Sequence, residues 1–333
     1  MIKGKVDNLA LERLILGFTG SSRPEVIVGP GVGEDCAVLD FGDYECVLST
    51  DPITASATRI GFLAVHISCN DIASNGVEPL AVMLTVLLPT TITEEEIKEI
   101  SRQADEAAKS LGVQIIGGHT EVTDAVMQPL ISSTAIGRAP KGFSVGSRSK
   151  VNRPSDGDLI VVTKQLAMEG TAIVAERCEK ELRSSMTESE IDRAKAMLDQ
   201  ISVVREGVIA GKIGVEAMHD VTEGGILGAL WETCSKTKTG AEIIASKLPI
   251  DDLTMTICAL LDLDPMRLIS SGSMLIYVKK EKWDSLSKEF LELGIEASII
   301  GNVKPEEYGI ELVMKNGDRE IVGPPGSDEV YKI

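Results

Sequence analysis

The chain has 333 residues, a formal net charge of −18 and an aromatic content of 3%. A surface this negative repels phosphate backbones and anionic lipid headgroups, and few rings are available to stack on bases. Neither a nucleic acid nor a membrane is therefore expected as a partner. The length predicts two domains. We place them at 1–145 and 155–333, around a Gly-, Ser-, Pro- and basic-rich linker at 141–158.

The first half reads as a mixture of helices and strands. Residues 9–16 are expected to be helical, and a glycine-rich loop within 26–41 leads into a strand. A strand at 45–49 runs into Thr50 and Asp51, and helical spacing of apolar residues predicts a helix at 59–75. Strands follow at 81–88, 113–116 and 129–137. Between the first two of these, a capping box at Thr93 and Glu96 opens a helix that ends at Gly112.

The second half continues the mixture. We expect strands at 159–163, 215–218, 273–278 and 297–301, helices at 170–182, 188–210, 225–235, 252–261 and 281–293, and a final hairpin at Asn316-Gly317. This order predicts an α+β protein in two halves. No two of the six cysteines are spaced as CxxC, no signal peptide opens the sequence, and the longest apolar run is too short to cross a bilayer. A cytoplasmic protein is expected.

The first chemically suggestive segment is Gly31-Val-Gly33-Glu34-Asp35. Glycines let a backbone approach phosphate closely, and carboxylates are the ligands that Mg²⁺ prefers. No Gly-Lys-Ser/Thr follows, so the segment is not a Walker loop. Alone, it is equally compatible with a plain acidic turn.

Two further acidic positions follow. Asp51 stands at an expected strand end, where an Asx turn is the ordinary alternative. Asn70 and Asp71 lie in a helix that otherwise looks partly buried, and a buried carboxylate is costly unless something compensates its charge. A metal ion would compensate it; a solvent-facing Asp71 is the alternative. His66, one turn earlier, reads better as a structural histidine.

Two polar glycine clusters complete the set. Gly117-Gly118-His119-Thr120 follows a strand and offers flexible backbone beside polar groups. His219-Asp220-Val-Thr222-Glu-Gly224-Gly225 precedes a helix, whose N-terminus can bind an anion. The alternative for the second cluster is a helix cap made by Thr222.

The order of these segments is more specific than any one of them. Gly-Glu-Asp-Cys-Ala-Val (33–38), Ser-Thr-Asp (49–51), the stretch 66–79, Gly-Gly-His-Thr (117–120) and the stretch 219–225 together resemble the aminoimidazole ribonucleotide (AIR) synthetase superfamily over about residues 5–323. Within it, Glu169-Gly-Thr-Ala-Ile-Val174 and Ile269-Ser-Ser-Gly-Ser-Met-Leu275 are most similar to the branch of the hydrogenase maturation protein HypE.

The resemblance implies a two-domain fold. Its N-terminal mixed sheet would dimerise into a β-barrel, and its C-terminal domain would be an α/β sandwich. It also implies ATP and Mg²⁺ as cofactors. The implied metal ligands are Glu34, Asp35, Asp51 and Asp71, the implied catalytic residues are Asp71, His119 and Asp220, and the implied nucleotide-binding residues are Gly31, Gly33, Asn70, Gly117, Gly118, Thr120, Thr222, Gly224 and Gly225.

The implied function is ATP-dependent phosphoryl transfer or dehydration, which activates an oxygen of an unidentified small-molecule or protein-bound acceptor. A homodimer and a maturation partner protein are expected. Two departures stand out. HypE proteins react at their own C-terminal cysteine, whereas no cysteine follows Cys258 here, and His119 replaces an acidic residue of many members. A small-molecule kinase like thiamine-monophosphate kinase, and a nucleotide-binding partner protein without turnover, remain as alternatives.

Overall fold

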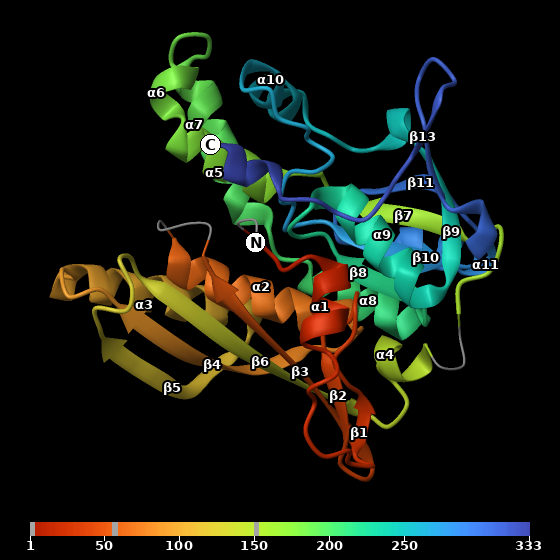
Figure 1. Cartoon of the computed structure of the whole chain (residues 1–333), viewed down its shortest axis with the longest axis horizontal. Helices are drawn as coiled ribbons and strands as arrows, with labels where there is room; N and C mark the ends of the chain where they lie inside the picture. Colours follow the sequence, from red (N-terminus) through yellow and green to blue (C-terminus); the bar gives the residue numbers. More distant parts are fainter. Residues whose placement is uncertain (1–3, 55–58, 150–152) are drawn as a thin grey trace.

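Two β-sheets organise the chain in the computed structural model, which describes residues 4–54, 59–149 and 153–333. Within these residues the first sheet has six strands in the order β1-β2-β3-β6-β4-β5, and the second has seven in the order β13-β12-β9-β11-β7-β10-β8. The sheets lie in different halves of the molecule, and helices fill the space between and around them (Figure 1). The mixed fold predicted from the sequence is confirmed, and the first sheet is open rather than a closed barrel over the described residues.

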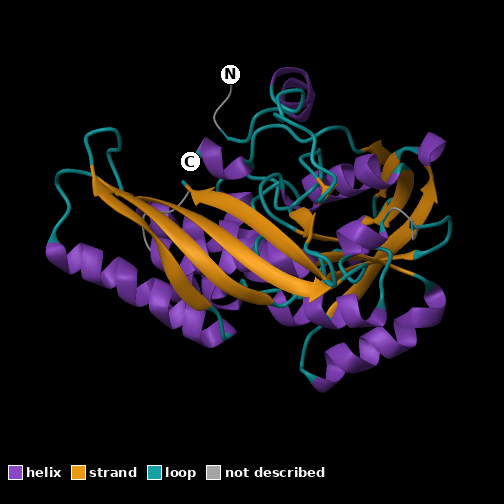
Figure 2. Ribbon diagram, turned by 90° about the horizontal axis from the view of Figure 1, so that it is seen from below, coloured by secondary structure: helices purple, strands orange, loops and turns teal. Residues whose placement is uncertain are grey.

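The first half supplies one sheet and the helices that cover it. Its elements are α1 (Asn8–Leu14), β1 (Val26–Val28), β2 (Ala37–Asp40), β3 (Tyr44–Ile53), α2 (Ile60–Ser74), β4 (Pro79–Leu88), α3 (Glu94–Leu111), β5 (Gln114–Val122), β6 (Leu130–Pro140) and α4 (Val145–Arg148). Figure 2 shows the strands lying across these helices with their other face uncovered. α2 packs against β3 and β6, against α3, and against α8 of the second half, which explains why nearly all of its residues are buried.

The second half wraps helices around a more buried sheet. Its elements are β7 (Leu159–Thr163), α5 (Met168–Arg177), α6 (Glu179–Leu182), α7 (Glu188–Ala196), α8 (Val204–Ile213), β8 (Ala217–Asp220), α9 (Gly225–Thr237), β9 (Thr239–Ile244), α10 (Asp252–Leu260), β10 (Met274–Val278), α11 (Lys280–Glu292), β11 (Ala297–Pro305), β12 (Ile310–Val313) and β13 (Arg319–Ile321). Every residue of β7 and β10 is buried, as expected for near-continuous apolar strands with both faces covered.

Most of the predicted elements are confirmed, including the capping box at Thr93 and Glu96, the left-handed cap at Gly112 and the final hairpin. The helices expected at 170–182 and 188–210 are both wrong as single elements. The first divides at Cys178 into α5 and α6. The second is broken into α7, a 3₁₀ turn (Met197–Gln200) and α8. Between the last two, the backbone of Ile201 and Val203 is bound by the side chain of Asn70 from α2. β9 was not predicted.

Two strands run further than the sequence indicated. β3 continues through Asp51 to Ile53, because its backbone pairs with β6 along its whole length. β5 continues through Gly117 to Val122, paired in parallel with β4, so the loop expected after residue 116 is wrong. The predicted linker contains α4, capped by Ser144, while its residues 150–152 lie outside the described part.

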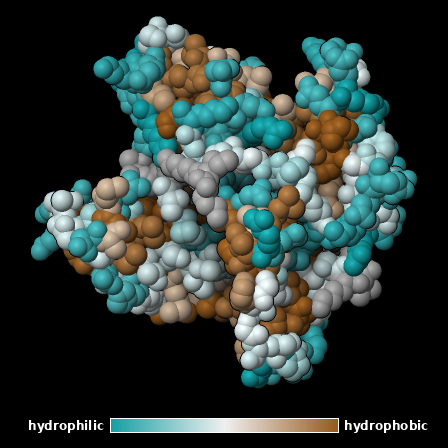
Figure 3. All heavy atoms as spheres, in the orientation of Figure 1, coloured by the Kyte–Doolittle hydropathy of each residue, from teal (hydrophilic) through white to brown (hydrophobic). Residues whose placement is uncertain are grey.

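Apolar side chains also reach the surface. Figure 3 shows hydrophobic atoms on the surface over α1 and β1. Leu9 of α1 and Val26 of β1 are among the exposed large apolar residues. Among the helices of the described residues, none combines the length and the hydropathy that a bilayer crossing requires.

Candidate active site

A cavity of about 890 Å³ lies between the two halves and collects most of the acidic residues singled out from the sequence. Its lining includes six predicted site residues from four separate segments: Glu34, Asp35, Asp51, Asp71, Asp220 and Thr222. Segments far apart in the sequence therefore meet at one place. The two glycines that precede Asp35 do not line this cavity: Gly31 lines a smaller neighbouring one of about 320 Å³, and Gly33 packs against α9. A Cβ at Gly33 would lie 2.8 Å from the Glu232 carbonyl oxygen, so only glycine fits this approach.

Strand β3 and helix α2 place two of the carboxylates. Asp51 is on β3, and Asp71 is on α2, which packs on that strand. The Ser49 hydroxyl donates a hydrogen bond of 2.5 Å to Asp71 Oδ2, and Ser74 donates one of 2.9 Å to Asp35 Oδ2. The solvent-facing alternative for Asp71 is wrong, because only 5% of this residue is exposed.

The crowding of carboxylates has electrostatic consequences. Burial, reinforced by the charges of Asp51 and Asp220, raises the pKa of Asp71 well above its usual range. Burial and the neighbouring Asp35 likewise raise the pKa of Asp220 to about 7. Asp220 Oδ2 is buried without a hydrogen-bond partner in the described residues. These features fit a site built for a divalent cation, since oxygen donors converge where positive charge would relieve their repulsion.

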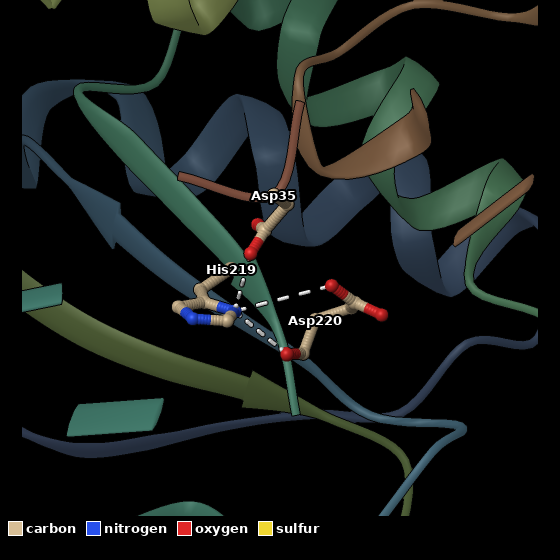
Figure 4. Close-up of side chains that lie close together, drawn as sticks. All are labelled: Asp35, His219 and Asp220. Atoms are coloured by element: carbon tan, nitrogen blue, oxygen red, sulfur yellow. Dashed lines mark hydrogen bonds and ion pairs between the residues drawn. The ribbon is translucent and has the colours of Figure 1, made fainter. Parts of the chain in front are cut away.

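His219 supplies part of that positive charge from within the protein. Figure 4 shows one nitrogen of its ring facing both Asp35 and Asp220, with Asp35 Oδ1 3.5 Å from Nδ1. Nδ1 also lies 2.7 Å from the Asp220 carbonyl oxygen, and Nε2 lies 3.0 Å from Glu232 Oε2. Burial alone would lower the pKa of His219, but the charge of Asp35 and the hydrogen bond to Glu232 raise it to about 9.

Asp35, His219 and Asp220 lie close enough together to share a metal ion. Both ring nitrogens of His219 are nevertheless occupied as donors, one to a carbonyl and one to a carboxylate. A protonated His219 supplies a donor to each of these two partners, and the carboxylates rather than this ring are the groups suited to hold Mg²⁺.

Several lining residues were not found by sequence reasoning. Lys5 lines the cavity, and its backbone N–H donates to Glu223 Oε1 over 2.8 Å. Burial lowers the pKa of Lys5, but Glu232 and Asp51 outweigh that effect and raise it above its ordinary value. Glu169 lines the same cavity from the first turn of α5. No pattern marks Lys5, and Glu169 belongs to the HypE-like stretch 169–174 without being predicted as a site residue. Each reaches the site through tertiary packing.

Other predicted site residues lie elsewhere. Asn70 is fully buried, its Nδ2 donating to the Ile201 carbonyl and its Oδ1 accepting from the Val203 N–H. Its amide is thus used to hold the two halves together. The Gly224 N–H donates to Asp328 Oδ2 over 2.6 Å, and the Gly225 N–H donates to the Thr222 carbonyl, so these two amides of the loop are already engaged.

The Gly117-Gly118-His119-Thr120 cluster lies outside the cavity of its own chain. It sits on β5, which pairs with β4 alone among the described strands and is exposed over nearly its whole length. The His119 side chain is 67% exposed, and its nearest charged neighbour is Glu121 at 3.4 Å. The four residues therefore form a polar segment on a free sheet edge.

Comparisons with known proteins agree with this architecture. Residues 33–139 match the N-terminal domain, and residues 155–313 the C-terminal domain, of AIR synthase related proteins. The fold resembles the solved HypE–HypF complex, with a TM-score of 0.77 and 22% identity over 95% of this chain and 99% of that one. It also resembles HypE solved with ATP, with a TM-score of 0.72 and 19% identity over 98% and 97%.

Relatives extend over most of the sequence. A protein of Methanocaldococcus jannaschii named for hydrogenase expression/formation is 31% identical over 92% of this chain and 91% of its own length. The carbamoyl dehydratase HypE of Rhizobium leguminosarum is 28% identical over 90% and 86%. The chain therefore belongs to the AIR synthase related family, among its HypE-like hydrogenase expression/formation proteins.

Proposed function

We propose that this chain is an ATP-dependent enzyme that transfers the γ-phosphoryl group of Mg-ATP to an oxygen of a carbonyl-type acceptor. The observation that carries the proposal is the convergence of Glu34, Asp35, Asp51, Asp71 and Asp220 on one cavity. Relatives named carbamoyl dehydratase and a similar fold solved with ATP support the same assignment.

Carboxylates of the first half would hold Mg²⁺. In this proposal Asp35, Asp51 and Asp71 are ligands, with Glu34 beside them. The ion, when bound, supplies charge neutralisation for the triphosphate. Lys5 adds a cation to the same wall, where it would contact phosphate oxygens. His219 lies beside Asp35 and donates from Nδ1 to the backbone carbonyl of Asp220, while its Nε2 contacts Glu232.

The protein's own contribution to the reaction is to position the acceptor oxygen and the γ-phosphate. Phosphoryl transfer requires an acceptor oxygen held in line with the γ-phosphate and water kept away from it. An oxygen phosphorylated in this way becomes a leaving group, so a carbamoyl acceptor loses the elements of water and becomes a nitrile. This is the dehydration for which the relatives are named.

A kinase acting on a phosphate-bearing acceptor is less well supported. Among the described residues that line the cavity, Lys5 is the single cation, and its neighbours are carboxylates. A second phosphate would have little to bind to. The partner-protein alternative predicts tight nucleotide binding without ADP release, which the same assay measures.

A homodimer is part of the proposal. The free edge of β5 carries the Gly117–Thr120 cluster, and Ile116 and Val122 on the same strand expose apolar side chains. An open, partly apolar edge is suited to pairing with another chain. A second copy would cover this edge and bring His119 and Thr120 toward the partner's nucleotide.

The proposal also covers the roles of the two domains, the cellular compartment and a partner protein. We assign nucleotide binding and dimerisation to residues 1–145 and the other wall of the cavity to 155–333. All six cysteines are unpaired thiols, which agrees with the reducing cytoplasm. A maturation partner protein is proposed because a similar fold is solved in complex with HypF.

The experiment that tests the function is turnover with a defined acceptor. Purified protein is incubated with Mg-ATP and N-acetyl-S-carbamoylcysteine amide, and ADP and the thiocyanate product are quantified. Formation of both in equal amounts supports the proposal. Nucleotide binding with no product from this or other carbamoyl probes favours the partner-protein reading.

A further inference from the structure

Glu169 is a buried carboxyl in the wall of the main cavity that none of the nucleotide-binding roles above uses. Only 3% of the residue is exposed, and its Oε2 has no hydrogen-bond partner in the described part of the chain. Thr222, Ser271 and Tyr331 line the same cavity. A buried acceptor left without a donor costs free energy, which points to a role beyond stability.

The protein holds this carboxyl with a rigid support. The Ala167 N–H donates to Ser270 Oγ over 2.7 Å, and the Gly170 N–H donates to the Ile269 carbonyl over 3.0 Å. A Cβ at Gly170 would lie 2.7 Å from that carbonyl, so glycine is required for the first turn of α5 to pack against residues 268–271. Glu169 is therefore fixed next to Ser271.

Asp328 completes the support from the C-terminal turn (Glu329–Lys332). Its Oδ2 accepts from the Gly224 N–H over 2.6 Å, and its Oδ1 accepts from the Ile269 N–H over 3.2 Å. One carboxylate thereby ties the loop that carries Thr222 to the segment that carries Ser271. This arrangement pre-organises one end of the cavity before any acceptor binds.

The charge state of Glu169 agrees with this role. Burial raises the pKa of Glu169 to about 7, while hydrogen bonding to Ser271 lowers it and the charges of Asp328 and Glu223 raise it. Its position in the first turn of a helix favours the ionised form, so desolvation outweighs the helix dipole here. A carboxyl that titrates near neutral pH is able to take up a proton and release it again.

We propose that Glu169 is the base that takes a proton from the substrate whose oxygen is phosphorylated. The proposal rests on the proposed function and deepens it. The acceptor class follows from the lining: hydroxyls and carboxyls surround Glu169, and Lys5 is the one cation of the described wall. A neutral group with an N–H to donate, such as a carboxamide, fits these surroundings, whereas an anionic group does not.

An N–H bond of the carboxamide breaks and its proton goes to Glu169. The electron pair forms a carbon–nitrogen double bond as the carbonyl oxygen bonds to the γ-phosphorus. The bond from that phosphorus to the bridging oxygen breaks, and ADP leaves with its electron pair.

The first test needs no turnover. Dicyclohexylcarbodiimide reacts with protonated carboxyls, so it should label Glu169 at about pH 6 and much less at about pH 9. Peptide mass mapping identifies the site. N-acetyl-S-carbamoylcysteine amide with Mg-ATP should protect it. Absence of label at both pH values, or label that the probe leaves unchanged, overturns the proposal.

The second test separates Glu169 from the nucleotide site. E169Q should lose at least about a hundredfold in turnover of the same probe, the usual size of a proton-transfer contribution, while Mg-ATP affinity stays within about twofold. E169D should recover part of the rate with a shifted pH profile. The matched control is E181Q, an exposed glutamate on the adjacent α6, which should leave rate and affinity unchanged.

The outcomes are distinguishable from failure of the proposed function. Wild-type protein that binds no Mg-ATP refutes the function whatever Glu169 does. Full turnover in a folded E169Q refutes the role of Glu169 and leaves the function standing. A wild type that binds Mg-ATP without converting the probe leaves the decision to the carbodiimide protection experiment.

Discussion

The hydroxyl of Ser49 on β3 donates a 2.5 Å hydrogen bond to the carboxylate of Asp71 on α2. One polar contact thus joins the sheet of the first half to its most buried helix, next to the cavity that both help to line. The contact satisfies one oxygen of Asp71 but does not neutralise its charge. Asp71 is therefore held in place in advance of the cation that the site is proposed to bind.

Replacement of Asp71 by Asn should weaken Mg-ATP binding and spare the fold. We expect a loss of about tenfold to a hundredfold in affinity, the value of about 1.5–3 kcal/mol for a hydrogen bond to a charged group. The nucleotide-free variant should melt no lower than wild type, because one of several repelling carboxylates is removed. Calorimetry and thermal unfolding measure the two effects.

The control for that variant is D105N, since Asp105 is exposed on α3 and paired with Lys109. It should alter neither quantity appreciably. A D71N protein with wild-type affinity for Mg-ATP would remove Asp71 from the site.

Asn70→Ala distinguishes a structural amide from a nucleotide ligand. The change leaves a buried carbonyl at Ile201 and a buried N–H at Val203 without their partner, so we expect a loss of about 2–4 kcal/mol in the free energy of unfolding. Mg-ATP affinity of the folded variant should stay close to that of wild type. Denaturant titration and calorimetry on the same preparation give both numbers.

Asn302→Ala is the matched control, because its side chain makes only long contacts of 3.4–3.5 Å. It should cost much less stability. A large loss of nucleotide affinity in a stable N70A protein would restore the direct nucleotide role expected from the sequence.

The pKa of Glu169 predicts a pH dependence of stability with a definite sign. The folded carboxyl has a pKa of about 7, above its ordinary value of 4.5, so it binds its proton more tightly when folded. The free energy of unfolding should therefore fall as pH rises from about 4.5 to about 7 and level off above, by about 3 kcal/mol at most. E169Q should lack this component, and a pH slope in E169Q equal to that of wild type would contradict the assignment.

The dimer proposal predicts complementation between two defective chains. If His119 acts across the interface, a mixture of D71N and H119A chains contains dimers with one intact site. After statistical exchange, about a quarter of the wild-type Mg-ATP sites should return. Recovery absent despite proven exchange of chains would place His119 and Asp71 in the same chain's site.

I116E, which charges the β5 edge, should give a monomer by light scattering.

The sequence predicted the acidic residues of the site better than it predicted their surroundings. Asp35, Asp51, Asp71 and Asp220 could be named in advance because carboxylates in partly apolar segments, in a recognisable order, are unusual. Lys5 and Glu169 could not, since only tertiary packing brings them to the cavity. The Gly117–Thr120 segment was expected to be a loop because glycines usually interrupt strands, yet pairing with β4 extends the strand through it.

The break between α7 and α8 shows the same limit. Apolar spacing over 188–210 favours one helix, but the amide of Asn70 binds backbone groups at 201 and 203 that a continuous helix would have used itself. Local pattern carries no information about a partner more than a hundred residues away. A helix break that depends on such a distant partner is found only from the three-dimensional structure.

The central claim is an acidic site that binds ATP through Mg²⁺, and calorimetric titration with ATP in the presence and absence of Mg²⁺ tests it most directly. Our account predicts binding that depends on Mg²⁺ and is weakened in D71N. Binding that is equally tight without the metal, or no binding under either condition, would contradict it.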